Sequence, residues 1–577
     1  MKKILLPLII SIFSFGASAE SVDYVLDVAN SITAFDASKS DFNIYYTAKE
    51  GTKARIGNTS GKRYYPISLT FKGAGISIND KVSTNPSCWN LLGNFDFTLD
   101  ATKGEQTIIK NESTAYISNQ TKQILIQAGT AEGETSTKPS AFIDLGTSYW
   151  ENKSSAEGSS QRPGFDIQVD TKIGTSAETY SHEYAVIFAS NSRLNISNNS
   201  TFTIEGGTRY YMDTTNAKLS AENGNNSIII VDEGSTLYLK GAKNSVESKT
   251  SFTVNGTLKL GDNTSFETTS TVFKTTINNL TTGSNVALVI GNETQINSGV
   301  TLGALTLKDT ANLSVGDITL NGAYTDSENS KLTYTGKFTY NNDSRLTINS
   351  ALTTSGDFEQ SLTTDKGVRI TNSLTLNSGA DWSVDGKVEV YENATLTINE
   401  GAKLTINGPA SNAKNGRLIL YKNSKVYLNA ENCTSMGDLY YLKIATMNTA
   451  EVANVYVQAN QKINSFYVNK SILNLYMSDD VMLELTTAAT GWAVDGVGDG
   501  ELRIHNFKEE TIKVSGKESS VLAGIEKYVK LYDNNGTLLG NATLSNGWIA
   551  LVVPEPAEWA MILGALALGL AVYRRRK

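Results

Sequence analysis

The chain is poor in the residues that most enzymes use for acid–base and nucleophilic chemistry. Its 577 residues include two histidines, His182 and His505, and two cysteines, Cys88 and Cys433. A Ser-His-Asp or Cys-His site needs one of these histidines. His182 has a serine and a glutamate beside it, but three adjacent residues of a strand point to alternate faces and cannot form a triad. We expect structural histidines and two isolated buried thiols, with a disulfide as the open alternative.

Charge, proline and helix-forming runs are also scarce. Charged residues make up 19% of the chain, below the usual quarter, and the net charge is −8, which makes nucleic acid an unsuitable partner. Only eight prolines occur. Periodic runs of Ala, Leu, Glu and Lys, which long helices need, are missing outside the two ends. Asn, Thr, Ser, Gly and Tyr are abundant instead, a composition typical of turns and half-buried strands.

The N-terminus has the three parts of a secretory signal peptide. Two lysines precede an apolar run over residues 4–15, and Ala17 and Ala19 then form an A-x-A arrangement before Glu20. The run is too short for an ordinary membrane span. We therefore expect residues 1–19 to be removed on export.

The C-terminus has three parts in order. It opens with a proline-rich tripeptide, Pro554, Glu555 and Pro556. This tripeptide can stop a strand and open a helix. An uncharged apolar stretch follows from Trp559 to Tyr573, with an aromatic residue at each end, where membrane interfaces favour them. The chain ends in a basic cluster, Arg574, Arg575, Arg576 and Lys577.

The apolar stretch predicts a transmembrane helix over 557–573. Such a helix rises about 25 Å against a hydrocarbon core of about 30 Å, so spanning needs slight thinning of the bilayer or snorkelling side chains. The positive-inside rule keeps the basic cluster in the cytoplasm. The rest of the chain then lies outside, as the signal peptide independently requires.

The tail over 554–577 resembles the PEP-CTERM sorting domain. The pattern of that family is Pro-Glu-Pro, one transmembrane helix and an arginine-rich end, and nothing in this tail departs from it. The resemblance implies processing by an exosortase, a membrane-embedded cysteine protease. It also implies transient anchoring in the inner membrane of a Gram-negative bacterium, and a destination at the cell surface or in an exopolysaccharide matrix.

Between the two ends, a short sequence pattern recurs from about residue 190 to 480. It consists of a strand of alternating apolar and polar residues followed by Asn, Gly, Asp or Ser. The clearest repeat is GADWSVDG, which begins at Gly379, and GAKLTING, which begins at Gly401; GSTLYLKG at Gly234 has the same frame. Two further strands lie between the later copies. Three strands from one copy to the next indicate one coil of a parallel β-helix, in which Asn residues at the corners can stack in ladders.

We therefore predict an all-β chain whose body is a right-handed parallel β-helix, with tandem β-sandwich domains as the alternative. The expected parts are a signal peptide (1–19), an irregular β-rich part (20–190), a repetitive solenoid (191–499), a hairpin cap (500–553) and the sorting tail (554–577). Turn sequences at 533–536 and 546–547 predict the two hairpins of the cap, which protects the exposed edge of the solenoid.

The sequence contains no zinc-ligand spacing, phosphate-binding loop or dinucleotide fingerprint. Residues 495–500 resemble a calcium loop in composition but lack the spacing and closing glutamate of an EF-hand. We predict no metal, no cofactor and no catalytic residue. The body resembles β-helical adhesins and autotransporter passengers, which implies a structural or adhesive role, with polysaccharide as the suggested partner. The alternative is a β-helical polysaccharide lyase or glycoside hydrolase, although no carboxylate pair recurs at the coil spacing.

Overall fold

The computed structural model describes a defined part of the chain. Up to residue 128 it describes the backbone of individual strands. Beyond that point it describes 140–152, 164–210, 227–361, 366–407, 416–436, 439–440, 451–485, 500–515, 525–552 and 556–575, except 176, 179, 189–191, 248–249, 270–272, 464–465 and 469–470. These residues form two compact units, unit 1 over 1–283 and unit 2 over 284–577.

In unit 1 the strands stack as parallel ladders, each ladder taking one strand from each coil. Ladder A consists of β8 (Phe95–Leu99), β11 (Gln123–Ala128), β14 (Gly164–Ile167), β17 (Arg193–Ile196), β20 (Ile228–Val231) and the first part of β23 (Ser251–Leu260). Ladder B consists of β2 (Ser31–Ile32), β4 (Ala54–Ile56), β6 (Ile76–Ile78), β9 (Gln106–Asn111), β12 (Ser140–Asp144), β15 (Asp170–Gly174), β18 (Thr201–Ile204), β21 (Thr236–Leu239) and the second part of β23.

A third ladder completes each coil of unit 1. Ladder C consists of β7 (Trp89–Leu91), β10 (Ile117–Asn119), β13 (Trp150–Asn152), β16 (Val186–Phe188), β19 (Thr208–Tyr210), β22 (Lys243–Val246) and β24 (Ser265–Thr268). The remaining strands are β25 (Thr275–Thr282), parallel to both parts of β23, and the parallel set β1 (Ser21–Leu26), β3 (Asp41–Tyr46) and β5 (Leu69–Lys72). Ladders A and B continue across residue 190, where the sequence suggested a change of character.

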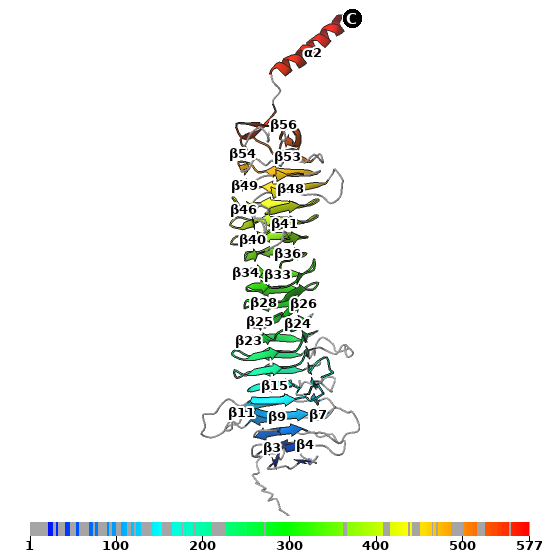
Figure 1. Cartoon of the computed structure of the whole chain (residues 1–577), viewed down its shortest axis with the longest axis vertical. Coiled ribbons are helices and arrows are strands. Elements are labelled where there is room, and N and C mark those ends of the chain that lie inside the picture. The colour runs from blue at the N-terminus through cyan, green and yellow to red at the C-terminus, as the bar shows by residue number, and fades with distance from the viewer. Residues whose placement is uncertain are drawn as a thin grey trace, which may run out of the picture. The chain divides into compact units, whose positions relative to one another are not determined.

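Unit 2 repeats this arrangement, and Figure 1 shows strands such as β34, β40 and β46 lying one above another. Ladder D consists of β28 (Val300–Leu302), β31 (Ile318–Leu320), β34 (Lys337–Tyr340), β37 (Asp357–Gln360), β40 (Asp381–Asp385), β43 (Lys403–Asn407) and β46 (Thr434–Met436). Ladder E has three parallel parts: β26 (Ala287–Ile290), β29 (Ala304–Leu307) and β32 (Tyr324–Thr325), then β35 (Leu346–Ile348), β38 (Val368–Ile370), β41 (Lys387–Val390) and β44 (Arg417–Leu420), then β47 (Leu439–Tyr440) and β50 (Phe466–Tyr467).

The other strands of unit 2 form two more parallel ladders. Ladder F consists of β27 (Glu293–Ile296), β30 (Asn312–Val315) and β33 (Lys331–Tyr334), then β36 (Ala351–Thr354), β39 (Ser373–Leu376), β42 (Thr395–Ile398), β45 (Lys425–Leu428), β48 (Val452–Val457), β51 (Ile472–Met477), β53 (Glu501–His505) and β55 (Val529–Tyr532). Ladder G consists of β49 (Gln461–Ile463), β52 (Leu483–Leu485) and β54 (Ile512–Val514). Stacked parallel sheets confirm the predicted solenoid-type architecture, and the sandwich alternative is wrong because its sheets are antiparallel.

The alternation of apolar and polar residues decides which side chains face the core. In β23, for example, Phe252, Val254, Leu258 and Leu260 are each at most 1% exposed, whereas the polar residues between them face outward. A period of two places successive side chains on opposite faces of a strand. Every coil therefore contributes apolar side chains to a core enclosed by its own strands.

The repeat that begins at Gly379 and again at Gly401 corresponds to one coil. Asp381 and Trp382 of β40 pair in register with Lys403 and Leu404 of β43, so the two copies lie directly above each other. The two glycines have φ angles of +95° and +77°, which only residues such as Gly and Asn adopt readily. Asn occupies the equivalent corner of the next coil, with a φ angle of +45° at Asn432 before β46. The repeat therefore encodes a corner and the strand that follows it.

Asparagine side chains at the corners form the predicted ladders. Asn399 Nδ2 donates to Asn377 Oδ1 over 2.9 Å, and Asn429 Nδ2 donates to Asn399 Oδ1 over the same distance. A second pair joins Asn423 Nδ2 to Asn393 Oδ1 at 3.1 Å. Each amide has both a donor and an acceptor, so identical residues can link successive coils. At Asn429 the Oδ1 is buried and has no hydrogen-bond partner among the described residues.

The parallel coils of unit 2 end in antiparallel strands. β55 pairs with β56 (Leu538–Ser545), and β56 pairs with β57 (Trp548–Leu551). In the first turn Asp533 Oδ1 accepts hydrogen bonds from the amides of Asn535 and Thr537, at 2.9 and 2.7 Å. In the second, Asn546 and Gly547 both have positive φ angles, as a two-residue hairpin turn requires. The two hairpins lie where the turn sequences placed them.

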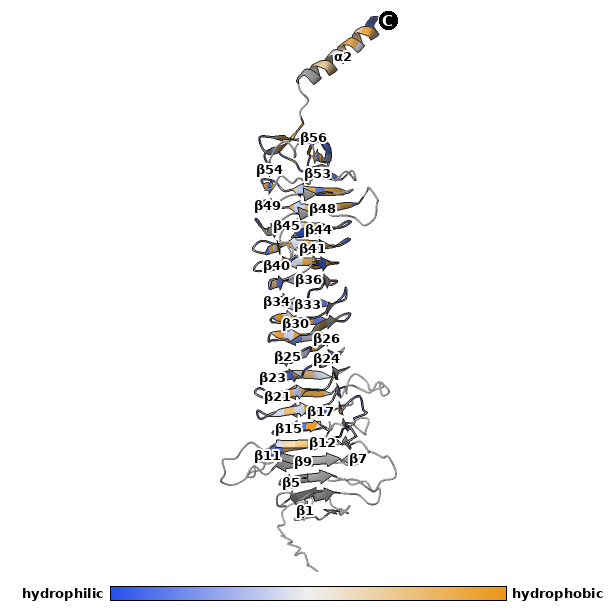
Figure 2. Cartoon of the chain, viewed as in Figure 1, coloured by the Kyte–Doolittle hydropathy of each residue, from blue (hydrophilic) through white to orange (hydrophobic). Residues whose placement is uncertain are grey.

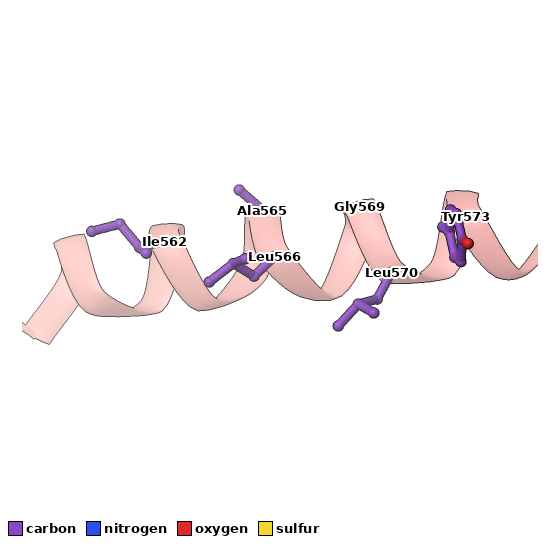
Figure 3. A pocket seen from close by; sticks show the side chains of 6 residues that line it. All are labelled: Ile562, Ala565, Leu566, Gly569, Leu570 and Tyr573. Carbon is purple, nitrogen blue, oxygen red and sulfur yellow. The ribbon is translucent and has the colours of Figure 1, made fainter.

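The helix α2 (Pro556–Arg575) follows the hairpins. Figure 2 shows that it is mainly hydrophobic, with a hydrophilic C-terminal end. One of its faces presents a row of apolar and small residues, Ile562, Ala565, Leu566, Gly569, Leu570 and Tyr573 (Figure 3). Among the residues that the structure describes, no helix is long and apolar enough to cross a membrane.

Candidate binding surfaces

The predicted sorting residues fall partly on described residues. Pro556 is the first residue of α2, Trp559 and Tyr573 lie within it, and Arg574 and Arg575 occupy its last turn. Cations at this end are favourable because the helix dipole is negative there. The other predicted positions lie outside the described residues: Ala17, Ala19, Pro554, Glu555, Arg576 and Lys577. The helix is therefore present, and its role in membrane anchoring stays a prediction.

His182 does not lie in a strand, and the assumption that it does was wrong. It precedes β16 in an irregular exposed segment. Its ring packs edge-on against Tyr149 and Tyr180, with centroids 4.9 and 5.7 Å away. The adjacent Glu183 forms an ion pair with Lys243 at 3.6 Å. These contacts give His182 a packing role on the surface of unit 1.

Cys433 follows a corner residue in unit 2 and is a free, buried thiol, 2% exposed. Burial raises its pKa to about 11, so it is protonated and unreactive at neutral pH. Its Sγ lies 3.6 Å from Gln461 Oε1. Other coils place a small buried residue, such as Ala402 or Ser424, at this position after the corner. Cys433 is therefore a packing residue, and Cys88 lies outside the described residues.

The most extended candidate surface is a stack of aromatic rings on the outward face of ladder F. We call it the ring row: Tyr427, Tyr456, Tyr476, His505 and Tyr532. Successive ring centroids are 4.5, 4.7, 4.6 and 4.8 Å apart, and the rings are within 20° of parallel. This spacing equals the distance of about 4.8 Å between neighbouring strands. The stack therefore follows the coils one ring at a time.

The ring row arises from the same alternation that builds the core. In the first three strands the ring lies between two buried apolar residues, as Tyr456 does between Val455 and Val457. His505 and Tyr532 end their strands, each after a buried apolar residue and before a polar one. Parallel pairing in register then sets Tyr456 above Tyr427 and below Tyr476. In the preceding coils the same row of ladder F carries Thr353, Thr375 and Thr397 in place of rings.

A polar row runs beside the rings, two residues earlier in each strand: Lys425, Asn454, Asn474, Arg503 and Lys530. Asn474 Nδ2 donates to Asn454 Oδ1 over 3.0 Å. That orientation leaves Asn474 Oδ1 as the acceptor for His505 Nε2, 3.3 Å away, so the proton of the neutral imidazole resides on Nε2. Together the two rows present a ring and a polar side chain in each of the five strands: an amide beside Tyr456 and Tyr476, and a cation beside the other three rings.

No family model matches the chain, and no curated protein or solved structure is similar to it. The similarity of the tail to PEP-CTERM domains therefore depends on the residues of the tail alone. Among the described residues, no three His, Cys, Asp or Glu side chains are grouped so that they could hold a metal ion.

The position of His505 in the ring row predicts a dependence of stability on pH. Burial between Tyr476 and Tyr532, and to a lesser degree the charge of Arg503, hold its pKa below the usual 6.5. The unfolded chain then binds the proton more readily than the folded chain, so stability is complete above about pH 6.5 and falls as the pH drops through the lowered pKa. We expect faster amide hydrogen exchange in β53 at about pH 5 than its intrinsic pH dependence explains.

The control for this prediction is His505→Phe, which keeps a ring in the stack and removes the titration. In this variant the protection of β53 against exchange, corrected for the intrinsic rate, should be the same at about pH 5 as above about pH 6.5. If the unmodified chain also showed equal protection of β53 under these two conditions, the prediction would be contradicted.

Proposed function

We propose that this protein is exported and delivered to the cell surface or polysaccharide matrix of a Gram-negative bacterium, where its solenoid has a structural or adhesive role. The observation that carries the proposal is the ring row with the polar row beside it. A polymer lying along ladder F meets an aromatic ring and a polar side chain in each of five coils, at the spacing of neighbouring strands. Such repetition suits a repetitive ligand, and a polysaccharide is one.

The geometry of the ring row suggests how a polysaccharide is held. Each inner ring is covered on both faces by its neighbours, so the faces do not offer a platform for stacking sugars. The phenolic hydroxyls, together with Asn454 and Asn474 of the polar row, supply hydrogen-bond donors and acceptors. We therefore favour hydrogen bonding over stacking as the mode of attachment.

The proposal also assigns a role to the C-terminal tail. Helix α2 serves as a temporary anchor in the inner membrane, with the basic end in the cytoplasm, until an exosortase cleaves the tail from the protein. The large apolar side chains of α2 support this, because Met561, Leu568 and Leu570 are at least 63% exposed and lack a partner surface among the described residues. We also propose that the solenoid is right-handed, because parallel crossover connections are right-handed in about 98% of cases.

Adhesion is tested with the full-length chain on an array of bacterial and plant polysaccharides. We expect binding, and we expect the double variant Tyr456→Ser, Tyr476→Ser to bind about tenfold more weakly, a loss of about 1.4 kcal/mol. The matched control is Tyr238→Ser, which removes an outward tyrosine of unit 1 and should leave binding unchanged.

Two outcomes would change the proposal. Absence of binding to every polysaccharide would remove the adhesive role and leave a passive role in the matrix. Depolymerisation of a bound polysaccharide would instead favour the second candidate, a β-helical carbohydrate-active enzyme.

A further inference from the structure

A group of cations gathers on the outward face of ladder E in unit 2. Arg369 of β38 and Glu389 of β41 are register partners, and Lys387 lies two residues before Glu389 on the same face. Arg345 directly precedes β35 and reaches the same carboxylate. We call these four residues, Arg345, Arg369, Lys387 and Glu389, the arginine cluster. It is built from three successive coils.

The carboxylate at its centre is almost completely buried. The side chain of Glu389 is 3% exposed, and its oxygens lie 2.7 Å from Arg369 Nε, 3.5 Å from Arg345 Nη2 and 3.7 Å from Lys387 Nζ. A buried carboxylate needs such partners, because leaving it unpaired is costly. One cation would neutralise it, yet both Arg369 and Arg345 reach it. The two arginines and Glu389 together therefore carry more positive than negative charge, in a chain whose net charge is −8.

The cations remain open to solvent while the carboxylate does not. The side chains of Arg345, Arg369 and Lys387 are 32%, 26% and 20% exposed. The Nε of Arg345 is buried and has no hydrogen-bond partner among the described residues. Because this atom is buried, an anion would meet the exposed parts of the two guanidinium groups instead, and would supply negative charge there.

Arg369 is also held in place. The guanidinium of Arg369 lies over the ring of Tyr391, 4.8 Å from its centroid, and the ring of Tyr421 is 4.9 Å from that of Tyr391. An arginine fixed by a carboxylate and an aromatic face loses little side-chain entropy on binding a ligand. Arginine also matches the geometry of a carboxylate better than lysine does, because its N–H groups form a planar fork.

We infer that the arginine cluster binds the carboxylate groups of an acidic polysaccharide, one rich in uronic acids. This inference rests on the proposed polysaccharide partner and specifies its chemical class. Arg345 and Arg369 contact the ligand carboxylate, and Lys387 adds positive charge. Glu389 is a positioning residue that holds the two arginines side by side.

The test compares binding of the full-length chain to polygalacturonate, to dextran sulfate and to neutral dextran. We expect polygalacturonate to bind most tightly. The double variant Arg345→Gln, Arg369→Gln should weaken this binding about tenfold or more and reduce its dependence on salt. The matched control is Lys331→Gln, Lys403→Gln, which removes the same charge from exposed strand positions of unit 2 and should change the affinity by no more than about twofold.

A second variant guards against misfolding, because the double variant leaves Glu389 buried with fewer partners. The triple variant Arg345→Gln, Arg369→Gln, Glu389→Gln removes the buried carboxylate as well. It should show the circular dichroism spectrum of the unmodified chain and the same loss of polygalacturonate binding. Retention of binding by a folded triple variant would overturn the inference.

The remaining outcomes separate this inference from the proposed function. Equal losses in the double variant and the lysine control would show general charge attraction and overturn the inference. Tighter binding to dextran sulfate would assign the site to sulfate groups instead. Binding to neutral dextran without binding to polygalacturonate would overturn the inference and leave the proposed function intact. No binding to any of the three would overturn the inference and leave the adhesive role to be decided by the wider polysaccharide array.

Discussion

Replacing Trp382 with alanine is expected to lower the free energy of unfolding by about 3–5 kcal/mol, the cost of a large cavity in a packed core. Trp382 of β40 is 1% exposed and stacks on Phe358 of β37, with ring centroids 4.5 Å apart. Phe338 lies one coil further along ladder D, 5.4 Å from Phe358. The three rings form a continuous inward column, so the cavity would affect the coils on both sides.

Hydrogen exchange is the suitable measurement, because repeat arrays need not unfold in a single step. Protection should fall most in ladder D, between β37 and β43. The control Trp382→Phe keeps an aromatic ring of the kind already present at Phe358, and should cost at most about 1.5 kcal/mol. A loss below about 0.5 kcal/mol for Trp382→Ala would show that this column is not part of the core.

Deletion of Arg574 to Lys577 is expected to leave most of the protein unprocessed and in the wrong location. Without these cations the positive-inside rule no longer holds the end of α2 in the cytoplasm. Replacement of Glu555 by Gln should have a similar effect through a different cause, because it alters the Pro-Glu-Pro signature that the proposed protease reads. Cell fractionation followed by immunoblotting measures both effects, since the unprocessed chain is longer.

The control for the tail is Glu558→Gln, which removes a nearby negative charge outside the tripeptide. This variant should be processed and delivered like the unmodified chain. Normal surface delivery of both the deletion and the Glu555 variant would contradict the proposed sorting mechanism. It would leave the ring row and the arginine cluster as binding surfaces without an assigned route to the cell surface.

The two proposed binding surfaces favour different properties of a ligand. The ring row offers mostly neutral groups over five successive strands of ladder F, and so favours length and regularity in a ligand. The arginine cluster on ladder E offers concentrated positive charge at one place, and so favours carboxylates. A polymer that satisfied both would need regular spacing as well as acidic groups.

Much of the architecture could be predicted because its signals are local. Alternation of apolar and polar residues marked the strands, and the two copies beginning at Gly379 and Gly401 marked the length of a coil. The corner asparagines and both hairpin turns followed from backbone preferences of single residues. The sandwich alternative stayed open only because strand direction is not visible in a short alternating pattern.

The binding surfaces could not be predicted, because coil lengths vary. Register partners in ladder F are one coil apart. The coil from Thr395 to its partner Lys425 is longer than the coil from Val452 to its partner Ile472. A fixed period therefore fails to bring the tyrosines of the ring row into line. The sequence signal for the ring row was an aromatic residue between two apolar residues in several strands. This signal does not indicate that the rings of successive coils are in contact.

The sequence by itself determined the alternating strands of the body and the apolar stretch near the C-terminus, and it predicts a signal peptide and a sorting tail. All of these depend on the order of neighbouring residues, which the sequence states directly. The tertiary structure decided which outward residues become neighbours, and with them the ring row and the arginine cluster. The physical reason is that the register between coils depends on the number of residues in each corner loop. Packing of the core determines which residues belong to the strands and which to the loops.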